Sequence, residues 1–137
     1  MSFFTINEFL HSDTAQRAGI NNSIPQNLVP NLEKTMAMME RVRAKLGHPI
    51  TISSGYRCPK LNAMVGGQVN SDHLLGFACD FVCPGFGTPD EIVKFLDPLR
   101  SELGFTQLIF EFSKNAKWVH ISTNPATKSN TFTLQKK

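Results

Sequence analysis

The sequence has few of the features that would set it apart from ordinary globular proteins. It contains three cysteines, one Trp and one Tyr in 137 residues, and its net charge is only +3. Three cysteines cannot all pair within one chain, so we expect reduced thiols and no disulfide framework. The mild charge, with Phe residues that follow no basic stripe, argues against a nucleic-acid-binding protein.

Cys79 and Cys83 are the one cysteine pair that could suggest a metal site. They lack the tight Cys-x-x-Cys turn of such sites, and on a strand they would point to the same face, two pleats apart. The sequence leaves a cysteine metal site open, but it favours small buried hydrophobic residues at both positions.

The chain also lacks a long apolar run, and its first residues lack the basic start of a secretory signal. We therefore expect no membrane insertion and a protein made in the cytoplasm, which another factor must release if it acts outside. The length suits one domain over residues 1–137, which we expect to be a monomer.

What the sequence does have is a succession of short periodic segments. Apolar residues spaced by three and four, and the signature Thr88-Pro89-Asp90-Glu91, indicate helices; β-branched alternation indicates strands. The expected helices span 6–13, 26–46 and 89–103 (interrupted at 97–98), with a helical turn over 59–65 and a loop over 14–27 that has room for one further helical turn. The expected strands span 50–53, 78–82, 106–112 and 117–122, with an edge strand over 131–134 before frayed lysines. This pattern predicts an α+β fold, a small antiparallel sheet with flanking helices 26–46 and 89–103.

The most informative stretch runs from Ser53 to Phe81. His73 and Asp80 lie seven residues apart, and Gly76 between them permits a sharp turn. An imidazole and a carboxylate are both zinc ligands, and a third ligand from elsewhere would leave a position open for water. The candidate third ligand is His120, and we expect the site on the open face of the sheet.

Glu111 is the candidate general base. If the hairpin closes symmetrically about residues 113–116, Glu111 lies opposite Trp118 and diagonal to His120 on one face. An acid there could take a proton from a metal-activated water. A one-residue slip would turn Glu111 away, and Glu111 could equally sit on a solvated face.

Each of these residues also has a purely structural interpretation. A lone histidine in a strand is commonly a satisfied structural residue. Asp80 is harder to explain in this way, because it lies in the apolar strand Ala78-Cys79-Asp80-Phe81-Val82 and a buried unpaired carboxylate costs several kcal/mol. Either Arg57 or a metal must compensate its charge.

The motifs together resemble those of the zinc D-alanyl-D-alanine metallopeptidases, whose fold is shared with hedgehog signalling domains. They are Ser54-Gly55-Tyr56-Arg57 with Leu61-Asn62 and Val65-Gly66-Gly67, Ser71-x-His73-x-x-Gly76-x-Ala78-x-Asp80, and Trp118-Val119-His120. The resemblance covers about residues 50–122 and extends to the small peptidoglycan lysins of bacteriophages.

This resemblance implies zinc as the cofactor and peptidoglycan stem peptides as the substrate. It implies His73, Asp80 and His120 as zinc ligands. Arg57 would hold the substrate carboxylate or carbonyl and steady the oxyanion. Trp118 would lie on the substrate side, and Ser71 either there or behind the zinc ligands as a supporting residue. The expected reaction is hydrolysis of a peptide bond, either as a D-Ala-D-Ala carboxypeptidase or as an L-Ala-D-Glu endopeptidase.

The sequence departs from the family pattern in two places. Cys58 replaces a serine, and the acid that many relatives carry just before the last histidine is absent, since Ala116 and Lys117 stand there. The base must then come from elsewhere, and Glu111 is our choice. The missing acid keeps two alternatives open: a non-catalytic peptidoglycan-binding or virion module, and a zinc-stabilised interaction domain of the hedgehog type.

Overall fold

The fold is built around one five-stranded sheet with the strand order β1-β2-β4-β3-β5. It is seen in a computed structural model that describes residues 2–136. The strands are β1 (Thr51–Ser54), β2 (Ala78–Val82), β3 (Gln107–Phe112), β4 (Lys117–Ser122) and β5 (Asn130–Gln135). All neighbouring pairs are antiparallel except β3 and β5.

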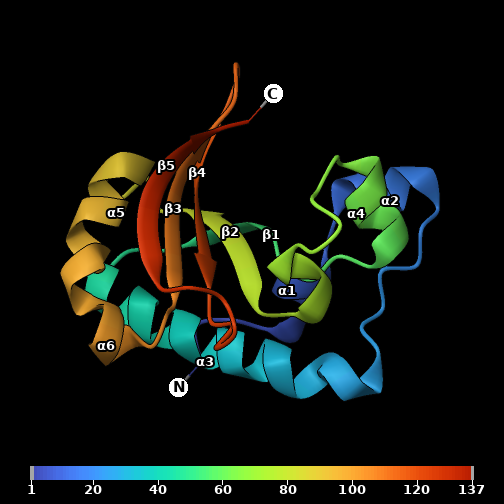
Figure 1. The fold of residues 1–137 in the computed structure, drawn as a ribbon, viewed down its shortest axis with the longest axis horizontal. Coiled ribbons are helices and arrows are strands. Elements are labelled where there is room, and N and C mark those ends of the chain that lie inside the picture. The colour runs from blue at the N-terminus through green and yellow to red at the C-terminus, as the bar shows by residue number, and fades with distance from the viewer. Residues whose placement is uncertain (1, 137) are drawn as a thin grey trace.

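Six α-helices and three short 3-10 turns surround the sheet (Figure 1). The helices are α1 (Ile6–Leu10), α2 (Asp13–Ala18), α3 (Val29–Leu46), α4 (Pro59–Met64), α5 (Pro89–Leu96) and α6 (Arg100–Leu103). The 3-10 turns are η1 (Gln26–Leu28), η2 (Asp72–Leu75) and η3 (Asp97–Leu99). In the view of Figure 1, α5 and α6 lie to the left of the strands, α2 and α4 lie to the right, and α3 runs along the bottom.

The hydrophobic core lies between the sheet and the helices α3 and α5. Alternate strand residues point into it because successive side chains of a strand face opposite sides. Cys79, Phe81, Leu108, Val119 and Ile121 from the strands meet Leu32, Met38, Met39, Val42, Leu46, Ile92 and Leu96 from the helices. Cys79 and Cys83 are fully buried in this core, so they are the small hydrophobic residues that the sequence favours.

Local signals place the main helices where the sequence predicts them. The Glu91 carboxylate accepts the Thr88 backbone N–H at 2.9 Å and so begins α5 with a capping box. α3 ends at Gly47, which has φ 70° in the left-handed region. The expected helix over 26–46 is confirmed as the turn η1 followed by α3.

The hairpin register is also confirmed. β3 and β4 pair Glu111 with Trp118 and Ile109 with His120. Glu111 and His120 therefore share a face of the sheet and lie diagonal to one another. This is the face away from the hydrophobic core.

The boundaries of the first two helices differ in detail from the prediction. The first helix ends at Leu10, three residues early, and the further helical turn allowed within 14–27 is α2, which begins at Asp13. α2 forms because the Ser12 hydroxyl accepts the Ala15 N–H and Gly19 ends the helix with φ 68°.

The α+β fold is confirmed, and so is the edge strand expected over 131–134, which is β5. β5 pairs parallel with β3, so the sheet is mostly rather than wholly antiparallel. Lys136, which was expected to fray, donates its backbone N–H to the Phe112 carbonyl at 2.6 Å; Lys137 lies outside the described residues. None of the helices in residues 2–136 has the length and apolar character that crossing a bilayer demands.

Candidate metal centre

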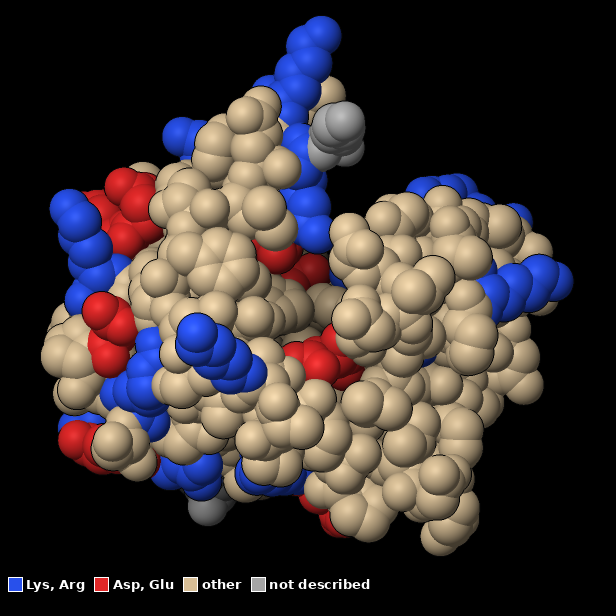
Figure 2. Space-filling model, in the orientation of Figure 1, with Lys and Arg blue, Asp and Glu red and all other residues tan. Residues whose placement is uncertain are grey.

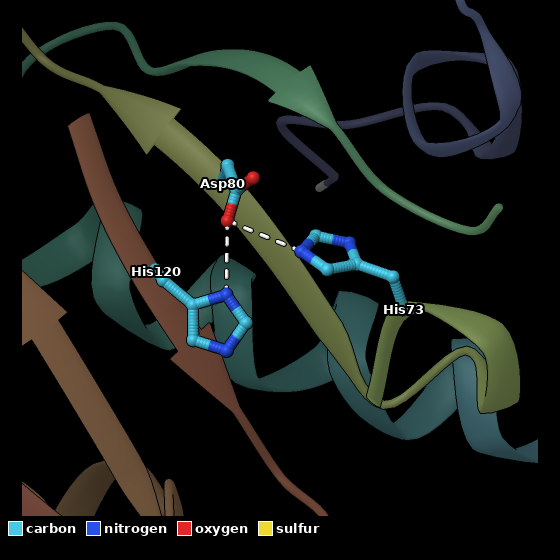
Figure 3. A group of neighbouring side chains, drawn as sticks. All are labelled: His73, Asp80 and His120. Atoms are coloured by element: carbon cyan, nitrogen blue, oxygen red, sulfur yellow. Dashed lines mark hydrogen bonds and ion pairs between the residues drawn. The ribbon is translucent and has the colours of Figure 1, made fainter. Parts of the chain in front are cut away.

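His73, Asp80 and His120 meet on the face of the sheet away from the core (Figure 3). One ligand atom from each lies within 4.8 Å of the others. Asp80 Oδ1 is 3.2 Å from His73 Nε2 and 3.0 Å from His120 Nδ1. All three side chains are buried, with 3 to 8 % of each residue exposed.

Each side chain is positioned by a different local device. His73 lies in η2, where the Ser71 hydroxyl accepts its backbone N–H at 3.2 Å. Gly76 then turns the chain into β2 with φ 81°, a conformation that a Cβ would strain. Asp80 on β2 and His120 on β4 are direct partners in the antiparallel ladder.

Electrostatics favour a charged carboxylate at the centre. Burial opposes the charged form of Asp80, but His73 and His120 outweigh it and hold the pKa of this carboxyl far below its usual range. Burial likewise opposes a charged His120, but its hydrogen bond to Asp80 and the charges of Asp80, Glu111 and Asp72 raise the pKa of this imidazole overall.

The three residues fit a zinc ion. His73 Nδ1 donates to the Gly55 carbonyl at 2.7 Å, so Nε2 is the ring nitrogen that faces Asp80 and that would bind a metal. Two imidazoles and one carboxylate make the donor set of a catalytic zinc site, in which three protein ligands leave one position open.

Arg57 is held against the cluster by several polar contacts. Its Nη2 is 3.5 Å from Asp80 Oδ2, its Nε donates to the Ser54 hydroxyl at 3.0 Å, and its Nη1 donates to Asn62 Oδ1 at 3.0 Å. Burial lowers the pKa of the Arg57 guanidinium, against the raising effect of Asp80 and Glu111. Arg57 thus compensates the charge of Asp80, for which the sequence predicts either Arg57 or a metal as the partner.

Glu111 is buried, with 5 % exposed, and does not sit on a solvated face. The Trp118 indole N–H donates to Glu111 Oε1 at 2.7 Å, and Lys136 Nζ lies 3.9 Å from Oε2. Trp118, expected on the substrate side, therefore orients Glu111. Ser71 supports the backbone of His73, which is the second of its two expected positions.

Comparison with protein families decides the class of this centre. The family model for Peptidase M15 matches residues 2–122, which is most of the chain. The chain belongs to the Peptidase M15 family. Members of this family are zinc metallopeptidases that act on peptidoglycan-type substrates, so the expected cofactor and enzyme class are confirmed. Comparison with the curated proteins returns no match.

The peptidase has one supporting residue at this centre that sequence reasoning missed. Asp72, next to His73, accepts hydrogen bonds from Ser122 Oγ at 2.8 Å, Asn124 Nδ2 at 2.8 Å and Thr127 Oγ1 at 2.9 Å. It joins the loop that carries His73 to the segment that follows His120. In the sequence, Asp72 is marked only by its position in the motif Ser71-x-His73, between two residues with predicted roles.

The surface of the peptidase is hollowed beside the centre. Figure 2 shows a depression between the sheet and the region of α2 and α4, with acidic atoms visible inside it. A substrate peptide that entered this depression would approach the sheet face that carries the cluster and Glu111.

Proposed function

We propose that this peptidase hydrolyses a peptide bond in peptidoglycan stem peptides, as a D-Ala-D-Ala carboxypeptidase or an L-Ala-D-Glu endopeptidase. The observation that carries the proposal is the convergence of His73, Asp80 and His120 on one sheet face that also bears the buried acid Glu111. The resemblance to bacteriophage lysins supports a role as a phage or prophage lysin acting on the bacterial cell wall.

The proposed roles follow from the position of each side chain. His73, Asp80 and His120 would hold the zinc, which when bound supplies a Lewis acid that polarises a carbonyl and makes water easier to deprotonate. Glu111 takes the proton from water and passes it to the leaving amine. Arg57 holds a carboxylate or carbonyl of the substrate and stabilises developing negative charge.

The local geometry suits these roles. Trp118 and Lys136 contact different oxygens of Glu111, so the carboxylate has a defined orientation on the wall of the site. The Arg57 guanidinium stays next to the cluster because its hydrogen bonds to Ser54 and Asn62 hold it in place. Fixed groups of this kind need no reorganisation during the reaction.

A second candidate is a non-catalytic peptidoglycan-binding module that retains the zinc site. Its support is the absence of an acid just before His120, where Ala116 and Lys117 stand. Both candidates bind zinc, and only the peptidase hydrolyses the bound peptide.

The deciding experiment is mass spectrometry of purified peptidoglycan fragments after incubation with zinc-loaded protein, beside a His120→Ala variant. We expect new fragments from the parent alone, and their masses identify the bond. Intact fragments from both proteins, with zinc measured in the parent, would contradict hydrolysis of this substrate and favour the binding module.

A further inference from the structure

A second concave site adjoins the metal centre on the far side of Arg57. It is a cavity of about 360 Å³ between α2, the end of β1 and α4. That volume lies within the range of small-ligand sites and is large enough for one or two amino-acid residues. The lining residues that matter here are Ser12, Asp13, Thr14, Arg17, Ser54 and Arg57.

Arg57 connects the cavity to the metal centre. Arg57 lines the cavity, and its guanidinium reaches Asp80 Oδ2 at 3.5 Å. Asn62 fixes the other edge of the guanidinium and donates to the Gln68 carbonyl at 2.8 Å. Gly67 leaves room for this arrangement, since a Cβ there would lie 2.0 Å from Asn62 Oδ1 and 2.8 Å from Arg57 Nη1. A peptide bound at Arg57 can therefore extend from the centre into the cavity.

The cavity presents hydrogen-bond donors and positive charge. The hydroxyl oxygens of Ser12 and Ser54 accept bonds from Ala15 N–H and Arg57 Nε, and their hydrogens have no acceptor among residues 2–136. Arg17 is exposed at the cavity, with no ion-pair partner in that part of the chain.

The one carboxylate at the cavity already has a partner. Asp13 Oδ1 lies 2.8 Å from His11 Nε2. Two guanidiniums against one carboxylate leave the lining net positive. With the hydroxyl donors this suits an anionic ligand, and a carboxylate fits the planar fork of Arg17 best.

We propose that this cavity is a subsite for the free carboxylate of the D-Glu residue beside the scissile bond of an L-Ala-D-Glu stem peptide, with Arg17 as its ion-pair partner. The proposal rests on the proposed function because it takes the substrate to be a peptide that runs past Arg57. It adds a specificity determinant, Arg17 on α2, that lies outside the zinc ligands and the base.

The test compares two peptides that differ in one group. The first is L-Ala-γ-D-Glu-L-Lys-D-Ala-D-Ala, with the free carboxyl of D-Glu; in the second that carboxyl is amidated. Calorimetry with metal-free protein gives the dissociation constants without turnover. The variants are Arg17→Gln, which removes the charge at the cavity, and Lys94→Gln, which removes an exposed charge on α5.

We expect the parent and Lys94→Gln to bind the acidic peptide about tenfold more tightly than the amidated one, and Arg17→Gln to lose this preference. Equal binding of both peptides by the parent, or an unchanged preference in Arg17→Gln, would overturn the subsite. If the parent binds the acidic peptide more tightly but the zinc-loaded protein cleaves neither peptide, the subsite is supported and the proposed hydrolysis is rejected. If the zinc-loaded protein cleaves the peptides but binds both equally, the hydrolysis is supported and the subsite is rejected.

Discussion

Asp80 and Glu111 are both buried carboxylates on one face of the sheet, but their neighbours differ. Asp80 lies between two imidazoles and a guanidinium, which suits a metal ligand that must stay ionised. Glu111 lies between an indole N–H and a lysine, and its oxygens contact none of the three presumed ligands. This difference supports our proposal that Asp80 binds the metal and Glu111 transfers the proton.

The Glu111→Gln variant tests this assignment. Glutamine keeps an acceptor for the Trp118 indole but cannot take a proton, so we expect kcat to fall by roughly 10²-fold or more while zinc content stays unchanged. Peptide hydrolysis and metal analysis on the same preparations measure both quantities. Glu33→Gln on α3, a surface carboxylate, is the control, and parental activity in Glu111→Gln would place the base elsewhere.

The residues of the centre were predictable from the sequence to different degrees. His73 and Asp80 belong to one short motif, and Glu111 and His120 to one hairpin, so local spacing and a symmetric turn were enough to bring them together. Arg17 and Lys136 were not predictable as neighbours of the site. Both come from segments whose packing depends on distant parts of the chain.

Among the elements, η2 and the end of β4 depend on each other through Asp72. This carboxylate ties the turn carrying His73 to Ser122, Asn124 and Thr127. Because His120 lies two residues before Ser122, Asp72 fixes the spacing between two of the presumed ligands. Groups that support metal ligands in this way commonly contribute 10- to 100-fold to metal affinity.

We therefore expect Asp72→Asn to bind zinc about tenfold more weakly than the parent. Its amide group replaces one acceptor by a donor, so we also expect the free energy of unfolding to fall by roughly 1–3 kcal/mol. A competition assay with a coloured chelator measures the affinity, and urea denaturation measures the stability. Asp90→Asn in the first turn of α5 removes an equal charge; an equal loss of zinc affinity in both variants would show a general charge effect.

The elements also show where sequence patterns lose their power. The strong capping box of α5 and the apolar periodicity of α3 are local signals, and both helices form as expected. α2 is short and polar, so only its cap residues Ser12 and Gly19 could have revealed it. The parallel pairing of β5 with β3 depends on how the chain returns after β4, and no local pattern encodes that path.

For the molecule as a whole, the metal centre is one face of a sheet whose other face is the core. No buried side-chain nitrogen or oxygen in residues 2–136 lacks a hydrogen-bond partner, and direct bonds between Asp80 and the two histidines contribute to this. The core between α3, α5 and the sheet forms without contribution from the cluster. We therefore expect the fold to persist without the metal, although the metal should stabilise it.

Removing zinc should lower the melting temperature and leave the protein folded at 25 °C. At a free zinc concentration of 100 times the dissociation constant, binding adds about 2.7 kcal/mol, which corresponds to roughly 10 °C for a chain of this length. Thermal melts followed by circular dichroism, with chelator and after zinc is added back, measure the shift. The His120→Ala variant should lose most of it; a chelated parent without helical signal at 25 °C would contradict this view.

Acid should weaken the stabilisation by zinc. The pKa of His120 is raised in the metal-free protein, so its bond to Asp80 stabilises that form at low pH and is lost as the pH rises through the raised pKa. Zinc requires the neutral imidazole, so protons compete with it, and affinity should fall about tenfold for each pH unit below that pKa. Asp80 stays ionised across this range because its own pKa is depressed.

We therefore expect zinc to raise the melting temperature less in mildly acidic buffer than in mildly alkaline buffer of equal ionic strength. Equal shifts in melting temperature in both buffers would exclude His120 as a ligand that competes with protons.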